Sequence, residues 1–454
     1  MAARSTDHVI KTRYSGQHIV CLDPGETYVL HLKDGSDREI RLVSVGEYRD
    51  HVMDRVRRAD ARVEINGQPL ALHCAPYVMP AEIAGIRIQA DTTSQWVELP
   101  KRVQLSIWDA ADPIVDTHKL RFPMPAYRLF SHGTQSYNEV VHLGTRDDTP
   151  AGPKQYHNYG EDWAGYEGTE EIVCCADGEV VRVGDWSVCI EDPDGFIWDY
   201  CHFDSIAPSL KVGDQVKQGH ALGILGKTGP SGRFSHLHVG TYISPEHLQA
   251  DQMNRRLNLY PWFITAYEAE FKHHLYAVAR PHQLALTGEK VVLDGRNSLS
   301  FGSRIVSYRW EFHDGQTVSA PVAERTYPSP GTYAAALWVQ DESGAEDVDF
   351  CTVKVFTEHA PENHVPTIFM THTPTAAVLP GQPVRFRCWL QKPDAEETMT
   401  IDFGDGTRIE KYESFSELDH TFRKPGIHIV TASTNVDGLP ITQKQKVVVS
   451  RPEL

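Results

Sequence analysis

The sequence has few positive charges for its size. Lysine and arginine together number 44, whereas aspartate and glutamate number 61, which gives a net charge of −17. An acidic surface of this kind repels phosphate backbones and anionic lipid headgroups. Nucleic acids and membrane surfaces are therefore not expected as partners.

Long apolar runs are also missing from the sequence. No stretch approaches the roughly 20 apolar residues that a membrane span needs. Residues 1–20 lack the charged start and apolar run of a secretory signal. We expect no membrane insertion, while the cellular address is not readable from this end of the chain.

Cysteine pairs with the spacing of a zinc knuckle do not occur. The eight cysteines are scattered and never form a C-x-x-C motif. Cys174 and Cys175 are neighbours, and on a strand they would point to opposite faces. We expect these two cysteines to be small buried apolar residues, and a thiolate zinc knuckle is not supported.

Patterns typical of β-strands dominate the sequence. Its 454 residues are too many for one hydrophobic core, so several domains are expected. Short alternating runs of Val, Ile, Tyr and Trp are separated by Asp-Gly and Asn-Gly turns, as at 34–35 and 66–67. We predict an all-β, multidomain protein. Residues 1–125 are expected to form a β-sandwich-like module that carries no cluster of reactive side chains.

One helix is predicted between the middle of the chain and its tail. Pro261 suits a first helical turn, and Trp262, Ala266 and Ala269 fit one helical face. We expect a helical linker at 261–281 that acts as a hinge.

The tail contains a repeated pattern. Residues 310–315 (WEFHDG) are followed by Tyr327 and by a Pro-Gly strand at 330–341, and residues 401–406 (IDFGDG) are followed by HTF at 420–422 and a Pro-Gly strand at 425–432. Both copies resemble polycystic-kidney-disease (PKD) domains, which are small immunoglobulin-like sandwiches. The resemblance implies PKD-like domains at 282–356 and 366–450, joined by a polar linker with two prolines.

The clearest candidate for chemistry is the tripeptide His236-Leu237-His238. Residues two apart on a strand point to the same face, so two imidazoles would lie side by side with Leu237 in the core. That arrangement suits a metal ligand beside a catalytic base. By itself an H-x-H pair is more often structural, so its neighbours in the sequence decide its meaning.

A series of motifs precedes this tripeptide in a fixed order. It comprises YHNYGEDW at 156–163, GT at 168–169, ADGEVV at 176–181, DYCHF at 199–203, VGDQVKQGHALG at 212–223 and a Gly-rich stretch at 226–232. This series resembles the lysostaphin/LytM family of zinc endopeptidases, whose pattern runs H-x-G-x-D, G-T-P-V, A-x-x-G-x-V, Y-x-H-L, G-D-x-V-x-x-G-x-x-I-G and H-L-H. The resemblance covers a peptidase domain at 126–260 with a small antiparallel sheet.

The resemblance also implies roles for individual residues. His157, Asp162 and His238 would hold Zn²⁺, while His202 and His236 would be catalytic. Two neutral imidazoles and one carboxylate leave zinc a fourth position for water. A nearby histidine could then move the water's proton to the leaving amine, and a second could stabilise the oxyanion. The sequence does not decide which histidine has which task.

One residue departs from the family pattern. His157 stands five positions before Asp162, whereas the family separates these ligands by four, and Asn158 occupies the expected position. Either Tyr159 is a one-residue insertion that still delivers His157, or the first ligand is lost and the domain is a degenerate binding module. We favour the insertion, with Glu161 as a reserve ligand.

These observations predict a zinc metallo-endopeptidase that hydrolyses peptide bonds in peptidoglycan. The alternative is a catalytically inactive LytM-like protein that binds cell wall or activates a partner, and a third hypothesis is a peptidase that acts on other proteins. The β modules would contact carbohydrate or protein. PKD-like modules mostly accompany secreted or surface enzymes, so a secreted or cell-envelope protein is expected.

Overall fold

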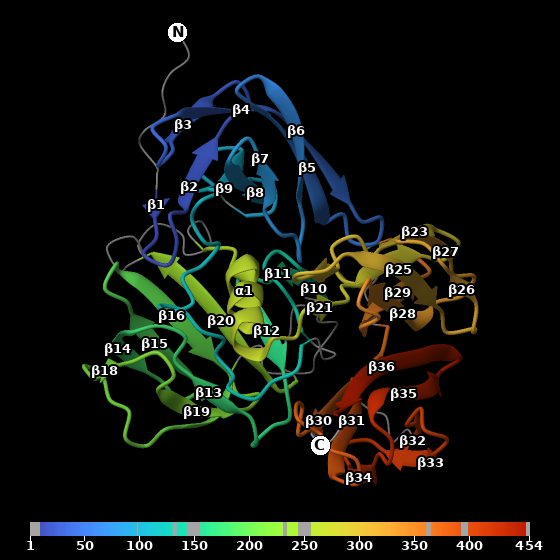
Figure 1. The fold of residues 1–454 in the computed structure, drawn as a ribbon. Coiled ribbons are helices and arrows are strands. Elements are labelled where there is room, and N and C mark those ends of the chain that lie inside the picture. The colour runs from blue at the N-terminus through green and yellow to red at the C-terminus, as the bar shows by residue number, and fades with distance from the viewer. Residues whose placement is uncertain are drawn as a thin grey trace.

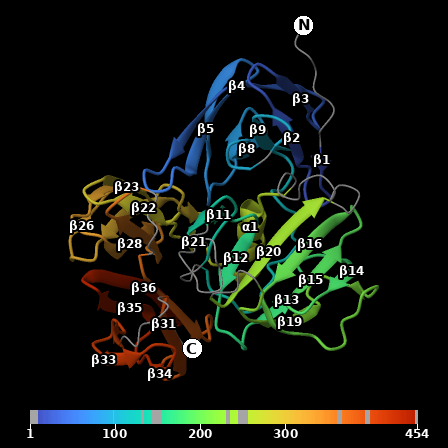
Figure 2. The ribbon, with the colours of Figure 1, turned by 180° about the vertical axis from the view of Figure 1, so that it is seen from behind.

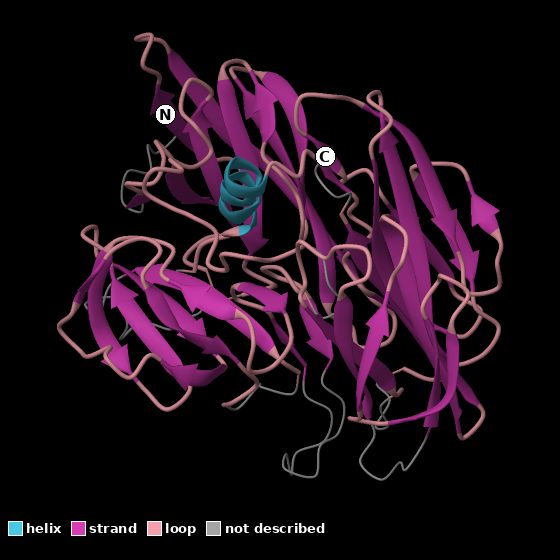
Figure 3. Ribbon diagram, turned by 60° about the horizontal axis from the view of Figure 1, so that its bottom comes forward, coloured by secondary structure: helices cyan, strands magenta, loops and turns pink. Residues whose placement is uncertain are grey.

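The computed structural model describes residues 10–97, 99–129, 134–142, 155–229, 234–243, 256–359, 365–391 and 398–450. Strands make up nearly all of its regular structure, as predicted, and Figure 3 shows one helix among them. Within these ranges, no helix has the length and apolar character needed to cross a bilayer.

The N-terminal module is built from two sheets. Their strand orders are β3-β4-β5-β6 and β1-β2-β9-β8-β7. The predicted Asn-Gly turn is present, because Ile65 pairs with Gln68 across it. The strands are β1 (Ile10–Lys11), β2 (His18–Leu22), β3 (Thr27–His31), β4 (Asp37–Arg49), β5 (Val56–Ile65), β6 (Gln68–Cys74), β7 (Ala81–Ile83), β8 (Ile86–Thr93) and β9 (Val103–Asp109).

The middle of the chain forms the sheet that carries the candidate site. Its six antiparallel strands run in the order β12-β20-β16-β15-β14-β18, beside a three-stranded sheet β13-β19-β17 and the pair β10-β11. The strands are β10 (Val140–His142), β11 (Gln155–His157), β12 (Glu161–Ala164), β13 (Glu171–Val173), β14 (Gly178–Val183), β15 (Ser187–Glu191), β16 (Phe196–Cys201), β17 (Phe203–Ile206), β18 (Gln215–Val216), β19 (Ala221–Leu225) and β20 (His236–Ile243).

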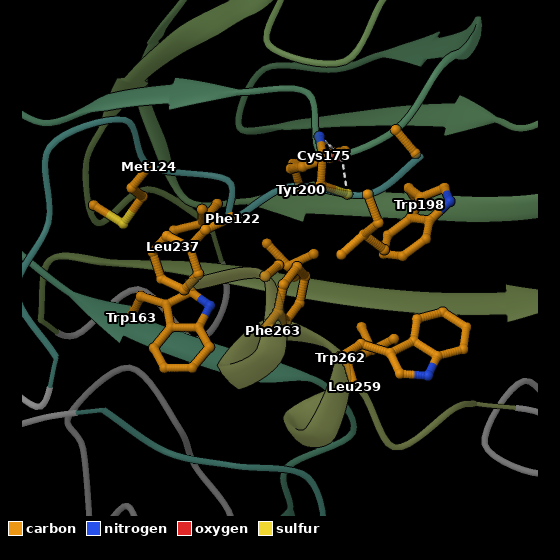
Figure 4. Close-up of a cluster of buried hydrophobic side chains, with 14 of the residues drawn as sticks. Phe122, Met124, Trp163, Cys175, Trp198, Tyr200, Leu237, Leu259, Trp262 and Phe263 are labelled. Carbon is orange, nitrogen blue, oxygen red and sulfur yellow. Dashed lines mark hydrogen bonds between the residues drawn. The ribbon is translucent and has the colours of Figure 1, made fainter. Parts of the chain in front are cut away.

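The predicted helix is present as α1 (Tyr260–Phe271), with Pro261 in its first turn. Its side chains Trp262 and Phe263 are buried in the same core as Trp163 and Leu237, as Figure 4 shows. The helix therefore belongs to the core behind the six-stranded sheet, although its sequence suggested a linker. Its aromatic content explains this position, because burial of each large ring contributes about 2–3 kcal/mol.

Two β-sandwiches form the C-terminal part and share one sheet. Strand β28 of the first pairs in parallel with β36 of the second at Thr332 and Ile441, within a nine-stranded sheet (Figures 1 and 2). The strands are β21 (Leu275–Tyr276), β22 (Gln283–Leu286), β23 (Lys290–Asp294), β24 (Leu299–Ser300), β25 (Ile305–Glu311), β26 (Thr317–Val318), β27 (Val322–Thr326), β28 (Gly331–Asp341), β29 (Glu346–Phe356), β30 (Thr367–Thr373), β31 (Pro383–Gln391), β32 (Thr398–Asp402), β33 (Arg408–Glu413), β34 (Glu417–Thr421), β35 (Gly426–Val436) and β36 (Leu439–Val449).

Candidate active site

The site lies on one face of the six-stranded sheet, where β20 runs between β12 and β16. The strand register places Asp162 of β12 and Cys201 of β16 opposite His238, and Ala164 opposite His236. Because side chains alternate along a strand, His236 and His238 share this face while Leu237 enters the core. The predicted geometry of the His236-Leu237-His238 strand is confirmed.

Asp162 and His238 are in direct contact. His238 Nδ1 lies 2.7 Å from Asp162 Oδ1, and His236 Nε2 lies 3.9 Å from Asp162 Oδ2. Burial alone would raise the pKa of the Asp162 carboxyl, but the neighbouring His236 and the hydrogen bond from His238 outweigh burial and lower it. The carboxylate is therefore ionised at neutral pH, which is the form that a metal ligand needs.

Backbone carbonyls fix the proton positions of the other two histidines. His236 Nδ1 lies 2.8 Å from Phe234 O, and His202 Nδ1 lies 2.6 Å from Thr228 O. A carbonyl oxygen can only accept a hydrogen bond, so both Nδ1 atoms carry the proton and both Nε2 atoms are the unprotonated nitrogens. Each ring is thus set up to accept a proton at Nε2.

His202 reaches the site through an unusual backbone conformation directly after β16. Its φ is 72°, in the left-handed region that non-glycine residues rarely adopt. Its ring centroid lies 4.4 Å from that of His236. Burial lowers the pKa of His202 to about 3 and also lowers the pKa of His236, so both rings are neutral at neutral pH.

His157 does not join this group in the structure. Its backbone, at the end of β11, pairs with Val140, and its ring lies 6.1 Å from that of Trp96 in the N-terminal module. Burial and the nearby Arg55 and Arg57 lower its pKa to about 4. The imidazole therefore faces the N-terminal module, and its role as a metal ligand stays a prediction.

The other two residues near the expected ligand position also point elsewhere. Glu161 accepts hydrogen bonds from Ser136 Oγ (3.0 Å) and from the backbone N–H of Tyr137 (3.2 Å). Strand alternation places it on the face opposite Asp162. Asn158 directs its amide to the carbonyl of Gln135 (3.5 Å). Neither supplies a third donor beside Asp162 and His238.

The donor set meets the chemical requirements of zinc in part. Zinc takes imidazole nitrogen and carboxylate oxygen, and Asp162 and His238 present both at close range, with two further imidazoles beside them. In the part of the chain that the structure describes, no three His, Cys, Asp or Glu side chains have the arrangement of a metal site. Two side chains that could hold a metal, Asp162 and His238, are together, and no third completes a metal site with them in the described residues.

Two further residues, neither of them predicted as a site residue, lie next to His238. The ring of Tyr159 stands edge-on to the His238 ring at a centroid distance of 4.7 Å, and Arg256 Cζ lies 3.7 Å from the centroid of the Tyr159 ring. Arg256 comes 18 residues after His238 and follows no strand motif. No signal in the sequence could have placed it there.

The second C-terminal sandwich also reaches the site. The ring of Phe234 stacks on His236 at 4.2 Å and on Phe369 of β30 at 5.2 Å. Polar contacts accompany this stack, because Tyr166 Oη donates to Glu417 Oε1 (2.8 Å) and Arg387 pairs with Glu167 (3.2 Å). A tail domain thus helps to fix the segment that orients His236.

Replacing Phe369 with alanine should loosen this support. We expect the free energy of unfolding to fall by about 1–2 kcal/mol, because a stacked and partly buried ring is lost. The turnover number kcat should fall about tenfold as His236 loses its fixed orientation. Phe415→Ala is the matched control, since Phe415 ends the same series of rings and is 57% exposed. Equal effects of Phe369→Ala and Phe415→Ala would contradict the role of Phe369 in supporting His236.

Comparisons with known proteins define the class of this site as a peptidase domain. The family model described as Peptidase family M23 matches residues 156–250, and the model described as PKD domain matches residues 276–355. The chain therefore contains a domain of peptidase family M23, followed by a PKD domain. The resemblance to the peptidase family and that of the first PKD-like copy are confirmed, while the second copy at 366–450 stays a prediction.

Several individual proteins are similar to parts of the chain. The pre-pro-metalloprotease PrtV of Vibrio cholerae serotype O1 is 36% identical over 78 residues, which are 17% of this chain and 8% of PrtV. The chain thus spans a small part of that relative's length.

Solved structures resemble separate segments. The catalytic domain of lysostaphin from Staphylococcus simulans has 22% identity, 32% coverage of this chain, 90% coverage of that domain and a TM-score of 0.20. The PKD1 domain of Vibrio anguillarum Epp is 25% identical to this chain. The match covers 19% of this chain and 93% of that domain, with a TM-score of 0.16. With TM-scores this low, neither likeness bears on the geometry of the site.

Proposed function

We propose that this protein is a zinc-dependent endopeptidase that hydrolyses peptide bonds in bacterial peptidoglycan. The observation that carries the proposal is the buried group of Asp162, His238, His236 and His202 on one sheet face of an M23 domain. A secreted or cell-envelope location follows from the same substrate, because peptidoglycan lies outside the cytoplasm.

Asp162 and His238 would hold the metal, and His157 is the predicted third ligand. Bound zinc supplies Lewis acidity for the attacking water and for the scissile carbonyl. His157 now faces the N-terminal module, so its participation requires a rearrangement of the segment before Asp162.

His202 and His236 would handle the protons. Each holds its Nδ1 proton against a backbone carbonyl, which leaves Nε2 to take the proton of the attacking water. The resulting imidazolium can pass that proton to the leaving amine nitrogen. The second ring would lie beside the reacting carbonyl, where the resemblance assigns it to stabilising the developing oxyanion.

Hydrolysis of purified peptidoglycan tests the proposal. The wild-type chain should release new amino groups from peptidoglycan and from a Gly-rich peptide, whereas His238→Ala should reduce the rate at least about 100-fold. His220→Ala is the control, since this histidine is exposed on a turn. Equal rates for wild type and His238→Ala would refute the assigned site.

Metal removal gives an independent test. Dialysis against a chelator should abolish hydrolysis, and one equivalent of Zn²⁺ should restore it. The purified chain should also retain close to one zinc per molecule after reconstitution, as measured by atomic absorption. Hydrolysis that persists in the metal-free protein would contradict the zinc mechanism.

Recognition without cleavage is the second candidate function. The position of His157, turned away from Asp162, is the specific observation in its favour. In that case the chain would bind peptidoglycan in a sedimentation assay, retain no stoichiometric zinc and release no amino groups. The same two experiments therefore distinguish the candidates.

A further inference from the structure

The face of β20 that carries the catalytic histidines continues past His238 to Gly240. A side chain at Gly240 would collide with Arg256, because a Cβ there would lie 2.8 Å from Arg256 Nη1. The same point lies 3.5 Å from His238 Nε2. The guanidinium of Arg256 thus takes the place of a side chain at the position next to His238.

Aromatic rings and backbone contacts hold this guanidinium. Its central carbon Cζ lies 3.7 Å from the centroid of the Tyr159 ring and 5.2 Å from that of Tyr242. Arg256 also forms a β-bridge with Tyr242, and Tyr137 Oη donates to its carbonyl oxygen (3.4 Å). The aromatic rings make cation–π contacts with the planar faces of the guanidinium. The N–H donors lie along its edge.

Part of that edge has no acceptor among the residues that the structure describes. Arg256 is 6% exposed, and within the described ranges its buried Nε and Nη1 atoms have no hydrogen-bond partner. The carboxylate of Asp199, which pairs with Gly240 across the sheet, is held by Arg182 (3.3 Å) and by the thiol of Cys189 (3.4 Å). Unpaired N–H groups of a buried cation are costly, and a carboxylate would satisfy two of them at once.

We propose that Arg256 is the carboxylate-binding residue of a substrate subsite beside His238. This inference rests on the proposed peptidase function and narrows its substrate class to peptides that carry a carboxylate close to the scissile bond. Positions 238 and 240 are about 7 Å apart along the strand, so the carboxylate belongs within about two residues of that bond. The anion is either a free C-terminus or an acidic side chain.

Peptide binding to the full chain tests this subsite without any hydrolysis. Isothermal titration calorimetry in the presence of a chelator would compare pentaglycine with its C-terminal amide. The wild type should bind the free acid at least about tenfold more tightly, because two charge-assisted hydrogen bonds are lost with the amide. Equal affinities of the two peptides, and of tetraglycyl-glutamate amide, would overturn the proposal.

The third peptide separates the two sources of the carboxylate. Tetraglycyl-glutamate amide should bind like the free acid if an acidic side chain is recognised, and like pentaglycine amide if only a C-terminus is recognised. Either preference over pentaglycine amide, that of the free acid or that of tetraglycyl-glutamate amide, supports the subsite.

Variants assign the preference to Arg256. Arg256→Gln should remove the difference between acid and amide, and Arg256→Lys should keep part of it, because lysine retains the charge but loses the fork of donors. Arg182→Gln is the matched control, since Arg182 lies on the same sheet and already has a carboxylate partner; it should keep the full difference. A preference that survives in Arg256→Gln would overturn the assignment.

A thermal unfolding scan would show whether each variant folds. The comparison of free acid and amide on the wild-type chain remains valid even if a variant does not. Failure of the subsite is also distinguishable from failure of the peptidase proposal. A chain that prefers the free acid but never hydrolyses peptides retains the subsite and refutes only the enzymatic function.

Discussion

Replacing His236 with alanine should lower kcat by about 10² to 10⁴-fold and leave KM nearly unchanged. The reason is that His236 holds its Nδ1 proton against Phe234 O and offers Nε2 for proton transfer, 3.9 Å from the Asp162 carboxylate. The ring is buried and neutral, so its loss removes a proton acceptor and not a substrate anchor. His202→Ala should give a loss of similar size.

The measurement is peptide hydrolysis over a range of substrate concentrations, with kcat and KM obtained separately. Zinc content of each variant serves as the internal control, since His236 and His202 are not assigned as metal ligands. A variant that keeps its zinc and loses kcat supports a catalytic role. A variant that loses its zinc along with kcat would show that the histidine is a ligand, which contradicts the assignment.

Replacing Arg280 with methionine should lower the free energy of unfolding by about 3–5 kcal/mol. Arg280 and Asp349 are both completely buried and 3.2 Å apart, so methionine would leave the Asp349 carboxylate without its cation. Arg280 Nη1 also donates to the carbonyl of Thr134 (2.5 Å). The neighbouring Gln135 forms a β-bridge with Asp162, so this arginine ties the first C-terminal sandwich to the strand of the site.

Urea unfolding followed by tryptophan fluorescence would measure this loss. Arg296→Met is the matched control, because Arg296 pairs with Asp294 at 2.6 Å on the surface, where such a pair contributes at most about 1 kcal/mol. Equal destabilisation by the two substitutions would show that burial of the Arg280 pair has no special cost. That result would contradict its role as an anchor between domains.

The features that were predictable from the sequence are those set by local patterns. The His236-Leu237-His238 alternation fixes which side chains share a face, whatever the rest of the fold does. The order of glycine turns around it identified the peptidase domain, and the Asp-Gly turns and following strands identified the PKD-like tail. Asp162 and His202 could be named because each stands in a motif with a defined spacing.

The position of His157 depends on contacts that no local pattern encodes. Its backbone pairs with residues near Val140, and this pairing turns the imidazole toward Arg57 and Trp96 of the N-terminal module. A shift of one residue on a strand moves a side chain to the other face, so a single extra residue before Asp162 has a large effect. The sequence showed that His157 stands five positions before Asp162, but not to which side its ring points.

Contacts between domains were equally beyond sequence reasoning. Phe369 and Phe234 are 135 residues apart, and only the folded arrangement stacks their rings beside His236. Arg256 likewise reaches the space beside Gly240 only in the folded chain. The helix was predicted correctly in type, but its burial behind the sheet follows from tertiary packing of Trp262 and Phe263.

A crystal structure of the zinc-reconstituted chain, with anomalous data collected at the zinc absorption edge, would test the central claim most directly. The account predicts one strong anomalous peak within bonding distance of Asp162 and His238, with His157 moved to the same ion. An anomalous map without a peak at Asp162 and His238 would contradict the claim that this sheet face is a zinc-peptidase site.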